Sequence, residues 1–222
     1  MAVIFSDDFE TKDFSKWTRY GNSVVSNLHS YSGSWAARAL GRAGNCYIDK
    51  NFGANYSLLV VEAQVLFEEY PAQTELYPNN LLFLVYYDGS WTMIAAFGMY
   101  PDGVGGYGWN LGYNNGGWGP SVQSTQQKNI LLNTWYKIKL MVKAGLGDGE
   151  IRCWVNDVEL TDLHRTGLNT SSSYMNYLEI ADSWFLQDYD DVVVSDQLQE
   201  ELLKHLNVNS NVSVSLTIRK VT

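Results

Sequence analysis

The amino-acid sequence predicts an all-β domain, a sandwich of two antiparallel sheets. Most segments either alternate apolar and polar residues or form short apolar runs, and both patterns are typical of strands. Turn residues separate these segments at short, regular intervals. With 222 residues, the chain is long enough for one large β-domain with a substantial core.

The first clear strands lie between residues 59 and 97. Residues 59–67 place five apolar side chains on one face: Leu59, Val61, Ala63, Val65 and Phe67. Residues 81–87 are apolar on both faces and predict a central strand. An Asp88-Gly89 turn then leads into residues 92–97, so these two segments are expected to form a hairpin.

The second half of the chain repeats the strand pattern. Residues 135–143 alternate, with Ile138, Leu140 and Val142 on one face and lysines on the other. Residues 150–160 predict a hairpin, entered through a turn at 147–149 and reversing near Asn156-Asp157. Residues 177–181 and 189–195 complete the set of strands.

The C-terminal segment has a different pattern. Residues 197–206 place four leucines on one side, which predicts one short helix with Asp196 as its N-cap. Residues 211–221 alternate again and predict a last strand. We therefore expect a main domain over residues 1–195 and an extension over 196–222 that packs on it or continues it.

The charge of the chain excludes some partners. The net charge is −9 and no basic cluster occurs, so neither nucleic acid nor an anionic membrane surface is an expected partner. No apolar stretch is long enough to span a membrane, so no membrane insertion is expected. The N-terminus lacks the basic region of a signal peptide, which leaves open a removed leader or another route. The three histidines lack metal-ligand spacing, which argues against a zinc site.

The two cysteines, Cys46 and Cys153, both lie in strand-like segments. Cys46 shares a face with Ile48, and Cys153 shares one with Ile151 and Val155. Both thiols are therefore expected to point inward. A disulfide between them and two buried free thiols both remain open.

The segment Gly98–Gly119 contains nine glycines and five aromatic residues. Glycine at this density indicates a backbone that turns tightly or lies close to another group. The rings either form an exposed surface that stacks on sugars or on a neighbouring protein, or pack back onto their own sheet as a Gly-rich hairpin.

Three motifs resemble those of concanavalin A-like and laminin-G-like domains. They are FSDDFETKDFSKW followed by SYSGSWAARA, then NTWYKIKLMVKAGLGDGEIRCWVNDVEL, and finally FLQDYDDVVVS. Their order covers residues 5–195 and resembles the carbohydrate-binding jelly rolls found in archaeal and bacterial surface proteins. The resemblance implies a jelly-roll sandwich and an extracellular or cell-surface location.

The resemblance also implies a structural calcium ion where the first strand meets the last. The matching positions are Asp8 and Glu10 at the start and Asp190 or Asp191 at the end, with carbonyl oxygens from Ser32-Gly33. Carboxylates and carbonyls are the oxygen ligands that Ca²⁺ prefers. The alternative is that the N-terminal carboxylates are solvated, with Arg38 or Arg42 as a counter-charge.

The second implied site is a glycan surface on the concave face or the rim loops. Sugar recognition needs flat apolar rings together with amides or carboxylates for the hydroxyl groups. The candidates are Trp91, Tyr107, Trp109, Tyr113 and Trp118, with Asn110, Asn114 and Asn115 as hydrogen-bonding partners. Trp17, Trp35, Trp135 and Trp154 lie within strand motifs and are expected to pack inside the protein instead.

Catalytic motifs of the same fold class are absent. The chain has no E-x-D-x-(x)-E run, no Q-I/V-H strand and no G-x-S-x-G elbow. Asp182 and Asp188 flank Trp184, in a context that favours a turn or ion binding. We therefore expect a non-catalytic, lectin-like domain. The alternatives are a self-associating structural subunit of a surface layer, filament or virion, and a divergent glycoside hydrolase or polysaccharide lyase.

Overall fold

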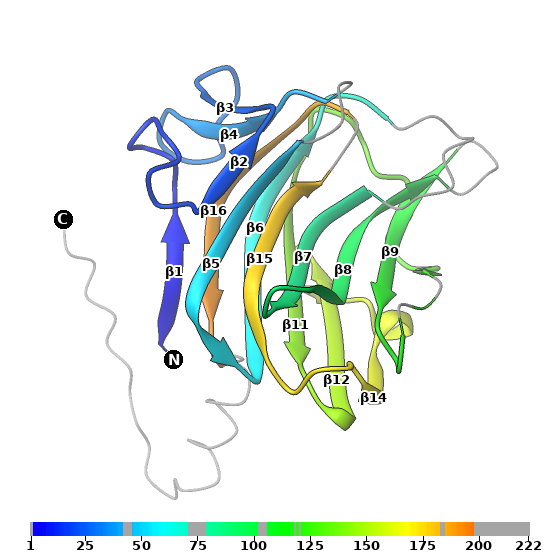
Figure 1. Ribbon diagram of the computed structural model, residues 1–222. Helices are drawn as coiled ribbons and strands as arrows, with labels where there is room; N and C mark the ends of the chain where they lie inside the picture. The colour runs from blue at the N-terminus through cyan, green and yellow to red at the C-terminus, as the bar shows by residue number, and fades with distance from the viewer. Residues whose placement is uncertain are drawn as a thin grey trace, which may run out of the picture.

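The computed structural model describes residues 2–41, 46–70, 79–101, 106–117, 119, 121–182 and 185–197. These residues form two antiparallel sheets that lie one against the other (Figure 1). The helical element of the described part is a 3-10 turn at Thr161–Leu163, and no helix there is long and apolar enough to cross a bilayer. The predicted all-β architecture of two antiparallel sheets is confirmed.

Sheet A consists of β1 (Val3–Asp7), β3 (Ser23–Ser26), β4 (Ala36–Ala39), β6 (Leu58–Phe67), β11 (Trp135–Lys143), β12 (Leu146–Val155), β13 (Val158–Glu159), β14 (Arg165–Asn169) and β16 (Gln187–Ser195). Its strands follow the order β13-β12-β11-β6-β16-β4-β3, with β1 paired to β16 and β14 paired to β12. The pairing of β1 with β16 places the first and last strands of the described chain side by side.

Sheet B consists of β2 (Arg19–Gly21), β5 (Tyr47–Tyr56), β7 (Asn79–Tyr87), β8 (Trp91–Pro101), β9 (Tyr107–Tyr113), β10 (Val122–Gln123) and β15 (Met175–Asp182). Its strands follow the order β10-β9-β8-β7-β15-β5-β2. The expected hairpin at Asp88-Gly89 is present, because β7 and β8 pair across this turn.

The hydrophobic core lies between the two sheets and follows from the alternation of the strands. All five predicted inward residues of β6 are buried there, and Ile138, Leu140 and Val142 of β11 meet them. The outer face of sheet B carries a separate buried cluster, which consists of Val85, Ala96 and Tyr177 packed with Met93. Sheet B is therefore apolar on both faces in its central strands.

The structure bears on the predicted hairpin over residues 150–160 and on the predicted C-terminal elements. Residues 147–149 lie inside β12 and not in a turn, because β12 extends back to Leu146 in order to pair with β14. The reversal near Asn156-Asp157 is confirmed, and these residues adopt φ angles of 50° and 63°. Apart from Gln197, the expected helix over 197–206 and the expected strand over 211–221 lie outside the described residues.

Both cysteines are reduced thiols buried in the core between the sheets, as the alternation predicts. Burial raises the pKa of the Cys153 thiol well above its usual value, so the reactive thiolate is scarce. We expect both thiols to resist a thiol reagent in the native protein and to react at once after unfolding. Labelling followed by mass spectrometry measures this, and rapid labelling of either cysteine in the folded state would contradict it.

Candidate functional site

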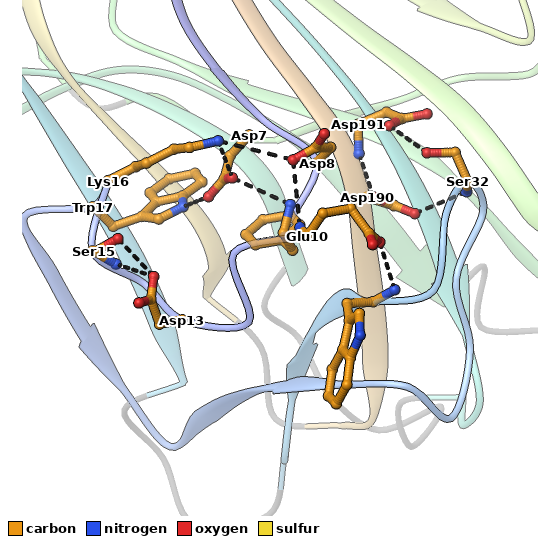
Figure 2. Close-up of polar contacts among 12 residues, drawn as sticks. Asp7, Asp8, Glu10, Asp13, Ser15, Lys16, Trp17, Ser32, Asp190 and Asp191 are labelled. Carbon is orange, nitrogen blue, oxygen red and sulfur yellow. Dashed lines mark hydrogen bonds and ion pairs between the residues drawn. The ribbon is translucent and has the colours of Figure 1, made fainter.

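The carboxylates at the start of the chain have separate roles. Asp7 is buried and accepts hydrogen bonds from Lys16 Nζ at 2.8 Å and Trp17 Nε1 at 2.7 Å (Figure 2). Asp8 is exposed, with one carboxylate oxygen 3.9 Å from the same ammonium group. The described counter-charge of this region is therefore Lys16. Arg38 pairs with Glu68 and Asp188 instead, so its proposed role is wrong, and Arg42 lies outside the described residues.

Glu10 holds the loop that follows β3. Its Oε1 accepts hydrogen bonds from the backbone N–H groups of Ser34 and Trp35, at 2.7 and 2.8 Å. Gly33 lies beside this carboxylate with a φ of +57°, and a Cβ at that position would collide with it. Glycine is thus required at position 33, in the Ser32-Gly33-Ser34 segment, both by the positive φ angle of the turn and by the close approach of Glu10.

Asp190 of β16 fastens the same loop from the other side. It is fully buried and accepts N–H groups from Tyr31, Ser32 and Asp191 at 2.8 to 3.0 Å. Ser32 Oγ donates to Asp191 at 2.8 Å. Burial raises the pKa of Asp190 to about 6, although the three N–H groups oppose this. Among the described residues, no cationic side chain forms an ion pair with it.

Of the predicted calcium ligands, Glu10, Asp190 and Asp191 all contact the loop between β3 and β4, which includes Ser32. Among the described residues, however, the metal-ligating side chains that gather in a group of three are those of His29, Glu68 and Asp188. Asp8 is the predicted calcium ligand that turns to Lys16 and solvent. A buried carboxylate without an ion pair fits a cation site, since a cation would compensate its charge. Carboxylate oxygens suit Ca²⁺, but the loop presents backbone N–H groups to them, and the calcium stays a prediction.

An ion cluster that sequence reasoning missed lies on the outer face of sheet A. Asp188 is fully buried and accepts from Arg38 Nη1 at 3.1 and 3.2 Å, while His29 Nδ1 lies 3.0 Å from its Oδ2. Glu68 contacts the same Arg38 and lies 3.4 Å from His29. Burial and the neighbouring Glu68 raise the pKa of Asp188 to about 6.

This cluster gathers His29, Glu68 and Asp188 closely enough to hold a metal ion, but Arg38 already lies among them. The guanidinium supplies the positive charge that two adjacent carboxylates need. We therefore assign the cluster to the structure of sheet A. It also places Asp188 inside β16 and not in the loop that the sequence indicated.

The Gly-rich segment forms β9 and packs mostly inward, so three of its proposed ligand residues are corrected. Trp109 is 1% exposed and packs against Phe97, Phe67 and Tyr136, with ring centroids 5.6 to 6.3 Å apart. Asn110 is fully buried. Asn114 is buried in a turn, where its side chain contacts the backbone of Met93 and Gly117 and the hydroxyl of Ser171.

The other predicted glycan-binding residues differ in how exposed their rings are. Tyr107 stacks on Tyr70 with centroids 4.1 Å apart, and Tyr113 lies under Arg165. Both rings are half-buried against the core. Trp118 lies outside the described residues. Trp91 is the first residue of β8, the strand that pairs with β9, and its side chain is 36% exposed.

Trp91 belongs to a group on the outer face of sheet B that we call the Arg19 patch. Its aromatic members are in mutual contact: Trp91 and Tyr87 lie 5.8 Å apart, and both lie within 6 Å of Tyr177. The Arg19 guanidinium lies 5.7 Å from the Trp91 ring and 4.8 Å from that of Tyr47. The patch consists of Arg19, Tyr47, Asp49, Tyr87, Trp91, Tyr177 and Glu179.

The charged members of the patch come from neighbouring strands β2, β5 and β15. Arg19 pairs with Asp49 across β2 and β5, and its Nε donates to Asp49 Oδ2 at 2.5 Å. Glu179 lies directly opposite Asp49 in β15. Asp49 is fully buried, and its burial raises its pKa although Arg19 opposes this. Arg19 itself is half-exposed, so the patch presents polar groups beside open rings.

The comparisons with known proteins come from structure. No family model matches the chain, and the curated proteins contain no match. An alginate lyase variant in complex with an alginate trisaccharide is 14% identical, with a TM-score of 0.54 over 84% of this chain and 90% of the lyase. The botulinum neurotoxin serotype G binding domain is 13% identical, with a TM-score of 0.51 over 92% of this chain and 50% of that domain. This chain thus spans about half of the neurotoxin domain, and both likenesses show the fold alone.

Proposed function

We propose that this chain is a carbohydrate-binding domain of the concanavalin A-like jelly-roll type, and that the Arg19 patch holds the glycan. The proposal moves the binding surface from the Gly-rich segment to the outer face of sheet B around Arg19 and Trp91. Because its partner would be a polysaccharide or a glycan, we propose an extracellular or cell-surface location for the domain.

The observation that carries this proposal is the pairing of open rings with fixed polar groups. Trp91 and Tyr87 are 36% and 43% exposed, and each can offer a flat apolar face to a sugar ring. Arg19 is held by Asp49, so its remaining N–H groups are oriented for a ligand before binding. Glu179 adds an acceptor for hydroxyl groups beside them.

The shared fold supports a glycan as the partner to test. The alginate lyase with a comparable fold is a complex with an alginate trisaccharide, so in that protein the fold accommodates an oligosaccharide. Its sugar and its activity are properties of that protein, and the proposal for this chain depends on the Arg19 patch.

We propose recognition and not catalysis. Glycoside hydrolysis ordinarily needs two carboxyl groups that flank the scissile bond. In the patch, Asp49 is fully buried and bound to Arg19, so it cannot reach a substrate. Glu179 is the carboxyl group of the described patch that is partly open to solvent.

Replacing Trp91 by Ala is expected to abolish glycan binding while the melting temperature changes little, because the ring is exposed and lies outside the core between the sheets. A glycan array followed by titration of the best binder measures this. The matched control is Tyr31→Ala, which removes an exposed ring on the sheet A side and is expected to leave binding unchanged. Full binding by the Trp91 variant would overturn the proposal. If the variant instead breaks up an oligomer in light scattering, the structural-subunit alternative takes its place.

We also propose that Glu10 and Asp190 take part in a structural calcium site. A ligand that binds the native state stabilises it, by about 2.7 kcal/mol at a concentration 100 times its Kd. Calcium is therefore expected to raise the melting temperature relative to chelator, and Glu10→Gln is expected to lose this response. Identical melting curves of the wild-type protein with calcium and with chelator would contradict the site.

A further inference from the structure

We propose, on the basis of the glycan site proposed above, that the Arg19 patch selects neutral sugars and discriminates against uronates and other acidic glycans. A site for an acidic sugar needs an excess of positive charge where the carboxylate of the sugar lies. The outer face of sheet B has the opposite balance around its exposed rings.

The cation of the patch is already neutralised. Arg19 directs both Nε and Nη2 to the same oxygen, Oδ2 of Asp49. Asp49 is fully buried, so this ion pair is only weakly screened by water on the acidic side. An incoming carboxylate would have to share Arg19 with a buried acid that has no other ion-pair partner among the described residues.

A second acidic residue, Glu179, adds negative charge to the patch. Glu179 lies opposite Asp49 in the pairing of β15 with β5, so two acidic side chains lie side by side on the face that carries Arg19. Burial raises the pKa of Asp49, whereas Arg19 and a hydrogen bond with Glu179 lower it. An acidic sugar on the rings of Trp91 and Tyr87 would add a third carboxyl group to this set.

No other described cation reaches the patch. Lys50 of β5 turns to the opposite face, where its Nζ lies 4.8 Å from the Phe5 ring. Lys128 lies beside Gly108 of β9, which pairs with Tyr100, nine residues along β8 from Trp91. Nine residues of strand span about 30 Å, and the charge is screened beyond about 8 Å at physiological salt. Arg42, which precedes β5 in the sequence, lies outside the described residues.

A neutral sugar meets none of these costs. Its hydroxyl groups can accept from the remaining N–H groups of Arg19 and donate to Glu179, while its apolar face stacks on Trp91 or Tyr87. The patch therefore matches the chemistry of an uncharged hexose or pentose chain.

Calorimetric titration with hexasaccharides of equal length tests this: neutral gluco-, xylo- and manno-oligosaccharides against oligomers of alginate and polygalacturonate. We expect a neutral oligomer to bind about tenfold or more tightly than either acidic one. Its affinity is expected to be insensitive to salt, whereas added salt should improve the weak binding of the acidic oligomers by screening repulsion. Glu179→Gln should raise the affinity for the acidic oligomers.

The outcomes separate the two proposals. Tighter binding of an acidic oligomer that Trp91→Ala abolishes would overturn the neutral preference and leave the site in place. Binding that Trp91→Ala does not affect, or no binding of any oligomer, would overturn the site itself. If Glu179→Gln fails to fold, the salt dependence of the acidic oligomers decides, and a salt-induced loss of their affinity would overturn the charge argument.

Discussion

Replacing Trp109 by Ala is expected to lower the free energy of unfolding by about 3–5 kcal/mol. The indole is 1% exposed and contacts rings from both sheets, Phe97 of β8 and Phe67 and Tyr136 of sheet A. Its removal would leave a cavity between the sheets that rigid strands cannot close. Because small domains are stable by about 5–15 kcal/mol in total, this single change removes a large share. Chemical denaturation measures the loss.

Trp91→Ala is the matched control, because it removes the same side chain from the same sheet at an exposed position. We expect it to leave the unfolding midpoint almost unchanged. If Trp109→Ala were as stable as the wild-type protein and bound no glycan, the ring would belong to a binding surface after all, and its place in the core would be wrong.

The error on Trp109 has a physical cause. The density of glycine in residues 98–119 indicated an irregular, exposed segment. Within it, however, Tyr107, Trp109, Leu111 and Tyr113 alternate with Gly108, Asn110 and Gly112, which is the period of a strand. In β9 the larger side chains of this pattern pack toward the core. The sequence therefore contains the strand pattern of β9, but the high glycine content favoured an irregular segment instead.

The strands themselves were predictable because their signal is local. Each inward face of β6 or β11 can be read from a run of nine or ten residues. The Glu10 and Ser32 positions followed from motif order, because the motifs resemble a known family. The ion pairs have no local signal.

The charged residues of the Arg19 patch meet because β2, β5 and β15 are neighbouring strands. Glu179 lies opposite Asp49 although the two are 130 residues apart in the sequence. The same holds for the cluster around Arg38, whose acidic partners are at positions 68 and 188. Such sites depend on which strands pair. A single sequence does not contain that information in any short window.

Arg38→Met is expected to destabilise the protein by about 3–5 kcal/mol at neutral pH, because it removes the guanidinium that pairs with the buried Asp188. The Arg38 side chain is 9% exposed and Asp188 is fully buried, so water cannot replace the lost partner. Methionine retains much of the apolar stem of arginine, so the loss reports charge more than packing. Urea denaturation at neutral pH measures it.

The pH dependence distinguishes a charge effect from a packing effect. The folded pKa of Asp188 is raised to about 6, above its usual value of 3.8, so the native state binds more protons than the unfolded state between these values. Stability from this group therefore falls as pH rises through that window, and Arg38→Met should deepen the fall. The variant is expected to recover much of its stability below about pH 5.

Two further variants serve as controls. Adding Asp188→Asn to Arg38→Met should recover part of the lost stability at neutral pH. Lys143→Met, which breaks an exposed ion pair with Asp148, should change the stability little. A loss that is equal at both pH values and is not relieved by Asp188→Asn would show that Arg38 stabilises sheet A by packing alone.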